Sequence, residues 1–200
     1  YHEVGLDYTL VSGQLYPPHY PHITALREEM SQWHFYYLEP DMMRRDAPVQ
    51  DVGVLDHDGS ELAPFYFTLQ RQEHKKFEGI AKALELLLPL AQGLAITLGP
   101  GGLLELSIRA SGTRFSSRLI SEGTLRILGL LAITHPRVPV SVVGYEEPEN
   151  GVHPRRQRLI AELFANARES GTQYLINTHS PLIVEGLQAT PEVAFISCYQ

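Results

Sequence analysis

The stretch 141–154, SVVGYEEPENGVHP, limits what this chain can fold into more than any other part of its sequence. It begins as a short run of β-branched and aromatic residues, a pattern typical of a parallel strand buried between layers of helices. The run ends abruptly in two adjacent carboxylates, Glu146 and Glu147. Ligands bind at the carboxyl ends of strands in open α/β sheets, so this acidic pair lies where a site is expected. The charges are also explained if the chain simply returns to water at this point.

Helical and strand patterns alternate in the second half of the chain, which predicts an α/β fold. After residue 119 the expected elements are helices at 123–134, 154–169 and 181–187 and strands at 138–145, 173–178 and 193–198. Strands that alternate with helices imply a parallel sheet with right-handed crossovers.

The first half predicts antiparallel strands and a helical lobe. Alternating apolar residues predict a strand at 2–11, and the turn at 99–102, GPGG, predicts a hairpin. The remaining expected pieces are helices at 23–32, 61–71 (with Ser60 as N-cap) and 73–92, an extended run at 33–38, a loop at 41–50, a strand at 52–55, a turn at 56–59 and hairpin strands at 94–98 and 103–109. The chain is expected to divide at residue 119, into 1–118 and 119–200.

Two further motifs flank the acidic strand end. In ISEGTLR, residues 120–126, Ser121 can cap the helix that follows, and Gly123 lets another molecule approach the backbone closely. The free N–H groups of a helix N-terminus bind anions, although a plain capped helix start explains the same residues. In INTHSP, residues 176–181, a strand ends in a histidine, His179, which can donate to a phosphate or orient a water. A single histidine at a strand end is more often structural.

The order of the three motifs resembles the C-terminal half of ABC-type P-loop ATPases, over residues 119–187. Within that class the chain looks most like the soluble SMC/RecF/OLD-like ATPases, whose strand often ends in Glu-Glu-Pro-Glu-Asn. The resemblance implies a P-loop NTPase-like, mostly parallel sheet flanked by helices, with an antiparallel portion and a helical lobe. It also identifies 1–118 as the strands and lobe of an ATPase head, and 119–200 as the C-terminal half of its core.

The resemblance implies site residues by position. Glu147 would orient or deprotonate the attacking water, His179 would contact the γ-phosphate of ATP, and Glu146, at the end of the Walker B strand, would hold Mg²⁺ through water. In this class the signature segment of one protomer closes on the nucleotide held by the other. The signature segment and the loop that crosses between protomers are matched by Ser121, Glu122, Gly123, Asn150 and His153.

The main departure from the class is the missing phosphate cradle. No Gly-x-x-x-x-Gly-Lys-Ser/Thr occurs, and GPGG lacks the lysine and is better explained as a hairpin turn. The cradle lies upstream in the intact protein or has been lost, and we expect it upstream because the chain starts at Tyr1 within an apparent strand. Glu122 and Thr124 replace glycines common in transporter cassettes, and Glu146 replaces the usual aspartate, which favours the soluble subgroup.

Charge and composition limit which partners and which cellular location the chain can have. A net charge of −7 argues against a whole-surface nucleic-acid binder, while a local basic patch such as Arg155, Arg156 and Arg158 is better explained as a solvated face. We find neither a membrane-spanning run nor a secretory signal, and the one cysteine, Cys198, fits a cytoplasmic protein. The run 56–58, Asp-His-Asp, has metal-binding residue types but the spacing of a turn.

The leading hypothesis is an ATP-binding and hydrolysing head domain that dimerises on nucleotide and drives a partner. The partner would be a nuclease, another effector or DNA, in repair or phage defence, and this part comes from the resemblance alone. The alternative is a degenerate, non-hydrolysing scaffold, which a degenerate upstream cradle would support. The nucleotide-binding subunit of a transporter is a third hypothesis, and the departures at Glu122 and Thr124 speak against it.

Overall fold

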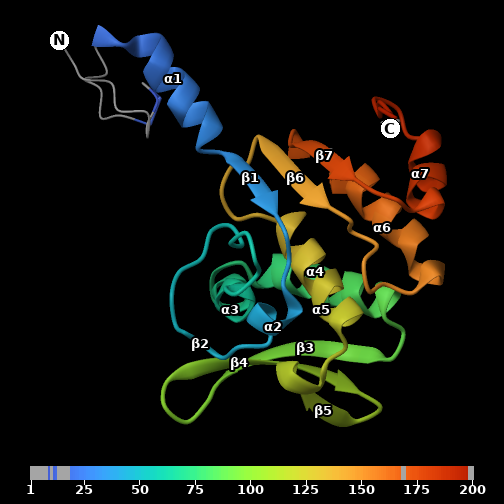
Figure 1. Cartoon of the computed structure of the whole chain (residues 1–200). Helices are drawn as coiled ribbons and strands as arrows, with labels where there is room; N and C mark the ends of the chain where they lie inside the picture. Colours follow the sequence, from blue (N-terminus) through green and yellow to red (C-terminus); the bar gives the residue numbers. More distant parts are fainter. Residues whose placement is uncertain (1–8, 10, 13–18, 168–169, 198–200) are drawn as a thin grey trace.

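A computed structural model describes residues 9, 11–12, 19–167 and 170–197 (Figure 1). Most of the predicted strand at 2–11 lies outside these residues, and so does Cys198. Two sheets with a layer of helices between them make up the main body, and the helix α1, Pro21–Met30, extends away from it (Figure 1). No residue of α1 is buried.

The acidic strand occupies the centre of a parallel sheet, as the sequence predicts. This strand, β6 (Val142–Glu146), pairs with β1 (Trp33–Tyr36) on one side and with β7 (Gln173–Asn177) on the other, and both pairings are parallel. The helix α6 (Pro154–Ala167) makes the crossover from β6 to β7, and α7 (Pro181–Gln188) follows β7. The predicted α/β class with a parallel sheet is confirmed.

The second sheet is antiparallel and is built around a hairpin. Its order is β2 (Ala47–Pro48), β4 (Leu103–Ala110), β3 (Ala91–Leu98), and β5 (Thr113–Ser116) also pairs with β4. The 3₁₀ turn η2, Ser117–Leu119, then leads into the second half. At the hairpin turn, Gly101 and Gly102 have φ of 94° and 79°, a region that favours glycine. The predicted hairpin is confirmed, whereas β2 and β5 were not predicted.

Three helices fill the space between the two sheets (Figure 1): α3 (Leu62–Gln72), α4 (His74–Leu87) and α5 (Glu122–Ile133). Most of α5 is buried, because it meets α3 and α4 as well as the short helix α2, Pro40–Met43. The fully buried Tyr66 of α3 donates its hydroxyl to the Leu128 carbonyl of α5 at 2.8 Å. No helix among the described residues is long and apolar enough to cross a membrane.

Several predicted element boundaries are wrong, each for a local reason. The helix predicted at 73–92 ends at Leu87, because Leu88 precedes Pro89 and is held extended, with φ −132° and ψ 84°. Ser60 does not cap α3, whose N-cap is Glu61, and the Ser60 hydroxyl instead donates to Asp56 at 2.6 Å. The predicted loop at 41–50 contains the end of α2 and β2, while the predicted strand at 52–55 is loop. Residues 193–197, the described part of the strand predicted at 193–198, form no strand.

Candidate functional site

The candidate site lies at the carboxyl edge of the parallel sheet, where β6 and β7 end side by side. Glu146 is in register with Asn177, and the next residue, Glu147, donates its backbone N–H to the Asn177 carbonyl at 2.8 Å. This pairing brings the two residues predicted to be catalytic together, with Glu147 Oε1 and His179 Nε2 3.7 Å apart. Both side chains reach solvent, with relative exposures of 41% for Glu147 and 82% for His179. They form an ion pair when the imidazole is protonated.

The backbone of Glu147 is in the left-handed region, with φ 48°. A residue with a Cβ pays about 1–2 kcal/mol for that conformation, so the surrounding hydrogen bonds must hold it there. Side chains of consecutive strand residues point to opposite faces, an alternation that would separate Glu146 from Glu147 if the strand continued. The strand, however, ends at Glu146, so a turn, and not strand alternation, sets the direction of Glu147. Strained backbone of this kind clusters at functional sites.

The turn after β7 is held against the loop after β6 by a residue for which no role was predicted. The Glu149 carboxylate accepts hydrogen bonds from Thr178 Oγ1 and from the backbone N–H of His179, both at 2.8 Å. Glu149 belongs to the Glu-Glu-Pro-Glu-Asn run that carries the family resemblance, but its partners lie 29 and 30 residues away. Only the pairing of β6 with β7 brings them together, so the sequence alone could not show the contact.

The predicted signature segment forms the start of α5. Ser121 is the N-cap of α5, and its hydroxyl accepts from the Thr124 N–H at 3.3 Å, which confirms the predicted cap. Glu122 is exposed in the first turn, where its charge favours the helix dipole. A Cβ on Gly123 would overlap the carbonyl oxygen of Gly151. The close approach predicted at Gly123 is therefore made by this chain's own loop after β6.

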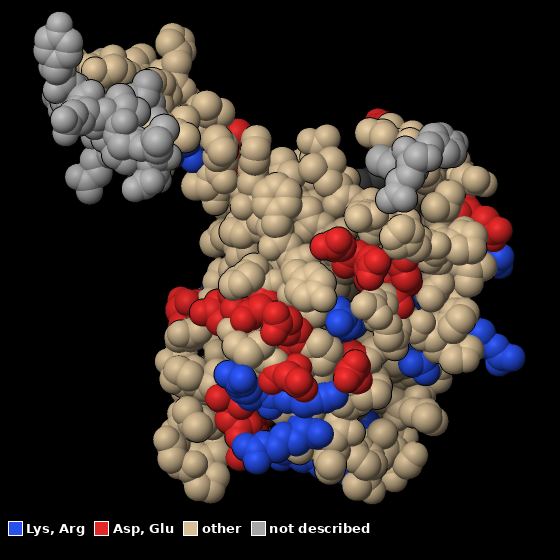
Figure 2. Space-filling model, viewed as in Figure 1, with Lys and Arg blue, Asp and Glu red and all other residues tan. Residues whose placement is uncertain are grey.

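The remaining predicted residues lie in the same loop or at the strand end. Asn150 is exposed, and its N–H donates to the Glu147 carbonyl at 3.0 Å. His153 is also exposed, and its Nδ1 accepts from the Arg155 N–H at 3.2 Å, at the start of α6. The Glu146 side chain is exposed as well, and among the described residues none forms a hydrogen bond or ion pair with it. Acidic side chains gather over the end of β6 (Figure 2).

A buried tyrosine lies beneath the loop that carries these residues. Tyr145 is 4% exposed, and its burial raises the pKa of the phenol far above its ordinary value. The positive charge of Arg126 on α5 opposes this rise, whereas the negative charge of Glu149 adds to it. The phenol is therefore neutral at physiological pH.

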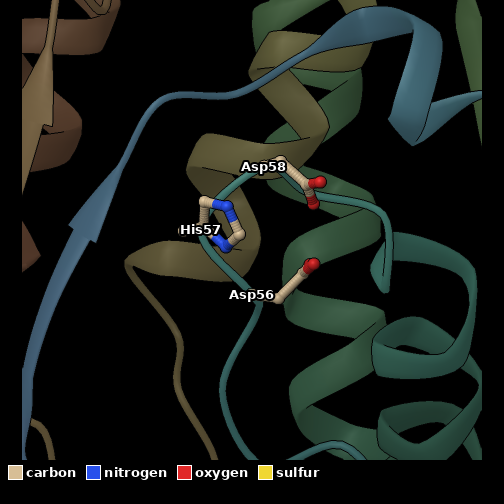
Figure 3. A group of neighbouring side chains, drawn as sticks. All are labelled: Asp56, His57 and Asp58. Carbon is tan, nitrogen blue, oxygen red and sulfur yellow. The ribbon is translucent and has the colours of Figure 1, made fainter.

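A second acidic cluster lies in the turn before α3 (Figure 3). Asp56, His57 and Asp58 offer metal-ligating atoms within 4.8 Å of one another, and the Asp56 carboxylate points toward Asp58. Burial raises the pKa of Asp56, and its hydrogen bond with Asp58 adds to the effect. The two carboxylates already accept hydrogen bonds from Ser60 and from the Glu61 N–H at 2.6–3.0 Å. These bonds shape the turn, as predicted at 56–59, and they account for the cluster without a cation.

Comparison with known proteins gives a family match over most of the chain. The family model described as "AAA domain, putative AbiEii toxin, Type IV TA system" matches residues 13–185. None of the curated proteins compared with the chain matches it.

Solved structures of SMC heads resemble the chain at low sequence identity. An Smc head domain with a coiled coil and joint from Pyrococcus yayanosii is 16% identical, with a TM-score of 0.49, over 60% of this chain and 24% of that one. A structure titled for ATP-driven dimerization and DNA stimulated activation of SMC ATPases is 14% identical, with a TM-score of 0.49, over 62% and 78%. The SMC head domain from Thermotoga maritima is 19% identical, with a TM-score of 0.42, over 63% and 44%. The chain thus spans less than half the length of the first and third of these proteins.

Proposed function

This chain belongs to the family of AAA domains described as the putative AbiEii toxin of a Type IV TA system, and from that premise we propose that it is the part of an ATPase head that positions the attacking water. The membership confirms the predicted kinship with P-loop ATPases. We propose further that the head is of the soluble SMC/RecF/OLD-like kind, that it dimerises on nucleotide, and that the dimer drives an effector.

The observation that carries this proposal is the pairing of Glu147 with His179. Hydrolysis of a phosphoanhydride needs a positioned water and a donor toward the phosphoryl oxygens. In this chain a carboxylate and an imidazole are 3.7 Å apart at the carboxyl edge of a parallel sheet, where ligands bind in such folds. Glu147 would orient the water or accept its proton, and His179 would donate to the γ-phosphate. The left-handed backbone of Glu147 supports a functional role for its direction.

The residues at the strand end fit a magnesium nucleotide. Mg²⁺ prefers oxygen ligands and keeps several of its waters, so an exposed carboxylate such as that of Glu146 suits it. The metal would supply charge compensation to the phosphates. Without a cation, the acidic side chains over the end of β6 would repel a triphosphate (Figure 2). Glu146 therefore holds the ion through water in this proposal, while Glu147 remains available for the attacking water.

This proposal places the phosphate cradle in a further segment, because no Gly-x-x-x-x-Gly-Lys-Ser/Thr occurs in these 200 residues. One face of the parallel sheet is open, with Phe35 60% exposed and Leu175 51% exposed on the two strands that flank β6. Parallel sheets are normally covered on both faces. This open face supports the proposal that a further segment, which carries the cradle, packs against the sheet.

We propose also that the start of α5 contacts the nucleotide held by a second copy of the protein. The Ser121 hydroxyl and the N-terminal dipole of α5 would bind the phosphates of the nucleotide held by the partner, with Glu122 lining the contact and Gly123 allowing the loop after β6 to lie close to the start of α5. Asn150 and His153 are both exposed in the loop after β6, as a crossing loop requires. DNA, a nuclease or another effector would then respond to the closed dimer.

Size-exclusion chromatography tests this arrangement in the full-length protein. Glu147→Gln should retain bound nucleotide, so with a slowly hydrolysed ATP analogue it should elute as a dimer, and without nucleotide as a smaller species. The same variant with Ser121→Arg, which blocks the start of α5, should stay small under both conditions. A single elution position in all four samples would refute the trans arrangement.

A non-hydrolysing scaffold is the second candidate, and the missing cradle is the observation that favours it. A scaffold needs the fold but not the chemistry. Wild-type full-length protein that binds labelled ATP and releases no phosphate would identify it. Release of phosphate that Glu147→Gln abolishes would establish the enzyme.

A further inference from the structure

We infer that Glu149 is a positioning residue, which sets the imidazole of His179 by holding the turn at 178–180 against the loop that follows β6. The inference rests on the proposed function, since His179 is taken to act on the phosphate. Glu149 would take no direct part in the reaction. It would connect the loop at 147–153, which carries Asn150 and His153, to the pair Glu147 and His179.

The contacts that define this role are two hydrogen bonds from one carboxylate. Glu149 Oε2 accepts from Thr178 Oγ1, and Glu149 Oε1 accepts from the backbone N–H of His179, both at 2.8 Å. Hydrogen bonds to an ionised group are about twice as strong as neutral ones. The imidazole itself is 82% exposed, so the packing around its ring does little to fix it. The position of the imidazole therefore depends on the backbone of the turn, to which Glu149 is hydrogen-bonded.

The donors present at the turn require an acceptor at residue 149. The Thr178 hydroxyl accepts from the Ser180 N–H at 3.0 Å, so its one hydrogen is free to go to Glu149. The His179 N–H is also a donor. A carboxylate offers acceptors on both oxygens, whereas the amide of glutamine offers one acceptor and one NH₂ group. Glutamine at position 149 would thus satisfy one donor well and the other only if the hydroxyl rotates.

A second connection links the same two segments. Gln157 of α6 donates from Nε2 to the Val152 carbonyl at 3.2 Å, and its Oε1 accepts from Ser180 Oγ at 2.7 Å. Ser180 is in turn the N-cap of α7. Glu149 and Gln157 therefore hold the loop at 147–153 and the turn at 178–180 as one unit. A second copy that contacts Asn150 or His153 would shift His179 through this unit.

The test is a double-mutant cycle between Glu149 and His179 in the full-length protein, read as ATP turnover. Glu149→Ala should lower kcat about 10- to 100-fold, because misplacement of a catalytic group by about 1 Å costs that much. Glu149→Gln should recover part of the loss. If Glu149 acts through His179, the double variant Glu149→Ala/His179→Ala should be no slower than His179→Ala alone. A structural defect unrelated to His179 would instead multiply the two losses.

Two companion variants keep the test decisive. Thr178→Val removes one of the two donors with little change of shape, and it should also lower kcat. It replaces Glu149→Ala in the test if that variant does not fold. Glu185→Gln on α7 alters an exposed ion pair with Arg158 of α6, and it should leave turnover unchanged. In the nucleotide-free protein, Glu149→Ala should also shift the His179 imidazole resonances, and Glu185→Gln should not.

The outcomes separate the inference from the proposed function. Wild-type turnover in both Glu147→Gln and His179→Ala would overturn the proposed function, and with it the inference. Lost turnover in those two variants, together with wild-type kcat in Glu149→Ala or multiplied losses in the double variant, would overturn the role of Glu149 alone.

Discussion

Replacement of Gly123 by alanine tests the contact between the start of α5 and the loop after β6. The added Cβ would overlap the Gly151 carbonyl oxygen, a backbone atom that cannot move aside as the end of a flexible side chain can. Gly151 itself has φ 69°, so its loop is held in a conformation that few residues adopt. One of the two segments must therefore shift.

The magnitude follows from two opposing effects. Overpacking of a well-packed contact costs about 1–3 kcal/mol. Alanine gains up to about 1 kcal/mol over glycine within a helix, and less in the first turn, where Gly123 lies. With a gain of about 0.5 kcal/mol in the first turn, the net expected loss is about 0.5–2.5 kcal/mol of unfolding free energy. For a chain of this length, each 1 kcal/mol lowers Tm by roughly 2–4 °C.

Gly79→Ala is the matched control, since Gly79 is exposed within α4 and an added Cβ there would meet nothing within 4 Å. It should raise the unfolding free energy by about 0.5–1 kcal/mol. Urea unfolding of both variants beside the wild type is the assay. If Gly123→Ala is as stable as the wild type or gains stability like Gly79→Ala, the claimed contact is wrong.

Three further predictions concern side chains that contact α3, α4 and α5. Tyr66→Phe removes a buried hydroxyl that donates to a carbonyl of α5 at 2.8 Å, and urea unfolding should show a loss of about 1 kcal/mol, with no loss contradicting that bond. Arg137 is 11% exposed and pairs with Glu73 at 2.8 Å, so Arg137→Met should cost about 2 kcal/mol by the same assay, whereas a change within 0.5 kcal/mol would refute its importance. Burial lowers the pKa of His135 below its ordinary 6.5, and the unfolded chain therefore takes up the proton first. Stability should fall as pH drops from about 6.5 toward the lowered pKa, and His135→Gln should flatten this fall between pH 7.5 and 5.5; equal slopes would contradict the assignment.

The second half of the fold was predictable because its patterns are local. The run that forms β6 is β-branched and aromatic, and Ser121 lies directly before an apolar helix. The first half was less predictable, because a proline can either interrupt a regular element or begin a helix. Pro40 follows the extended run at 33–38 and also begins α2, where its missing N–H costs nothing.

The approach of Glu147 to His179 was predictable from the order of the motifs, whereas the contacts around the two residues were not. Chain order places Glu147 and His179 at the ends of two strands, and adjacent parallel pairing then brings them together. The role of Glu149 depends on which donors face it across the sheet, and the role of Gly123 depends on which atom approaches it. Both contacts join segments that are far apart in the sequence, so they depend on the tertiary structure. The left-handed backbone of Glu147 is likewise set by its hydrogen bond to the Asn177 carbonyl and not by its own preference.

Single-turnover release of phosphate from ATP by the full-length protein tests the central claim most directly, with the wild type and Glu147→Gln compared at saturating Mg·ATP. Removal of a positioned general base usually costs about 10²–10⁴-fold. The site described here predicts a loss of at least about 100-fold in Glu147→Gln, with nucleotide binding retained. Equal rates in the two proteins would show that the carboxylate beside His179 does not act on the attacking water, and the account would then be wrong.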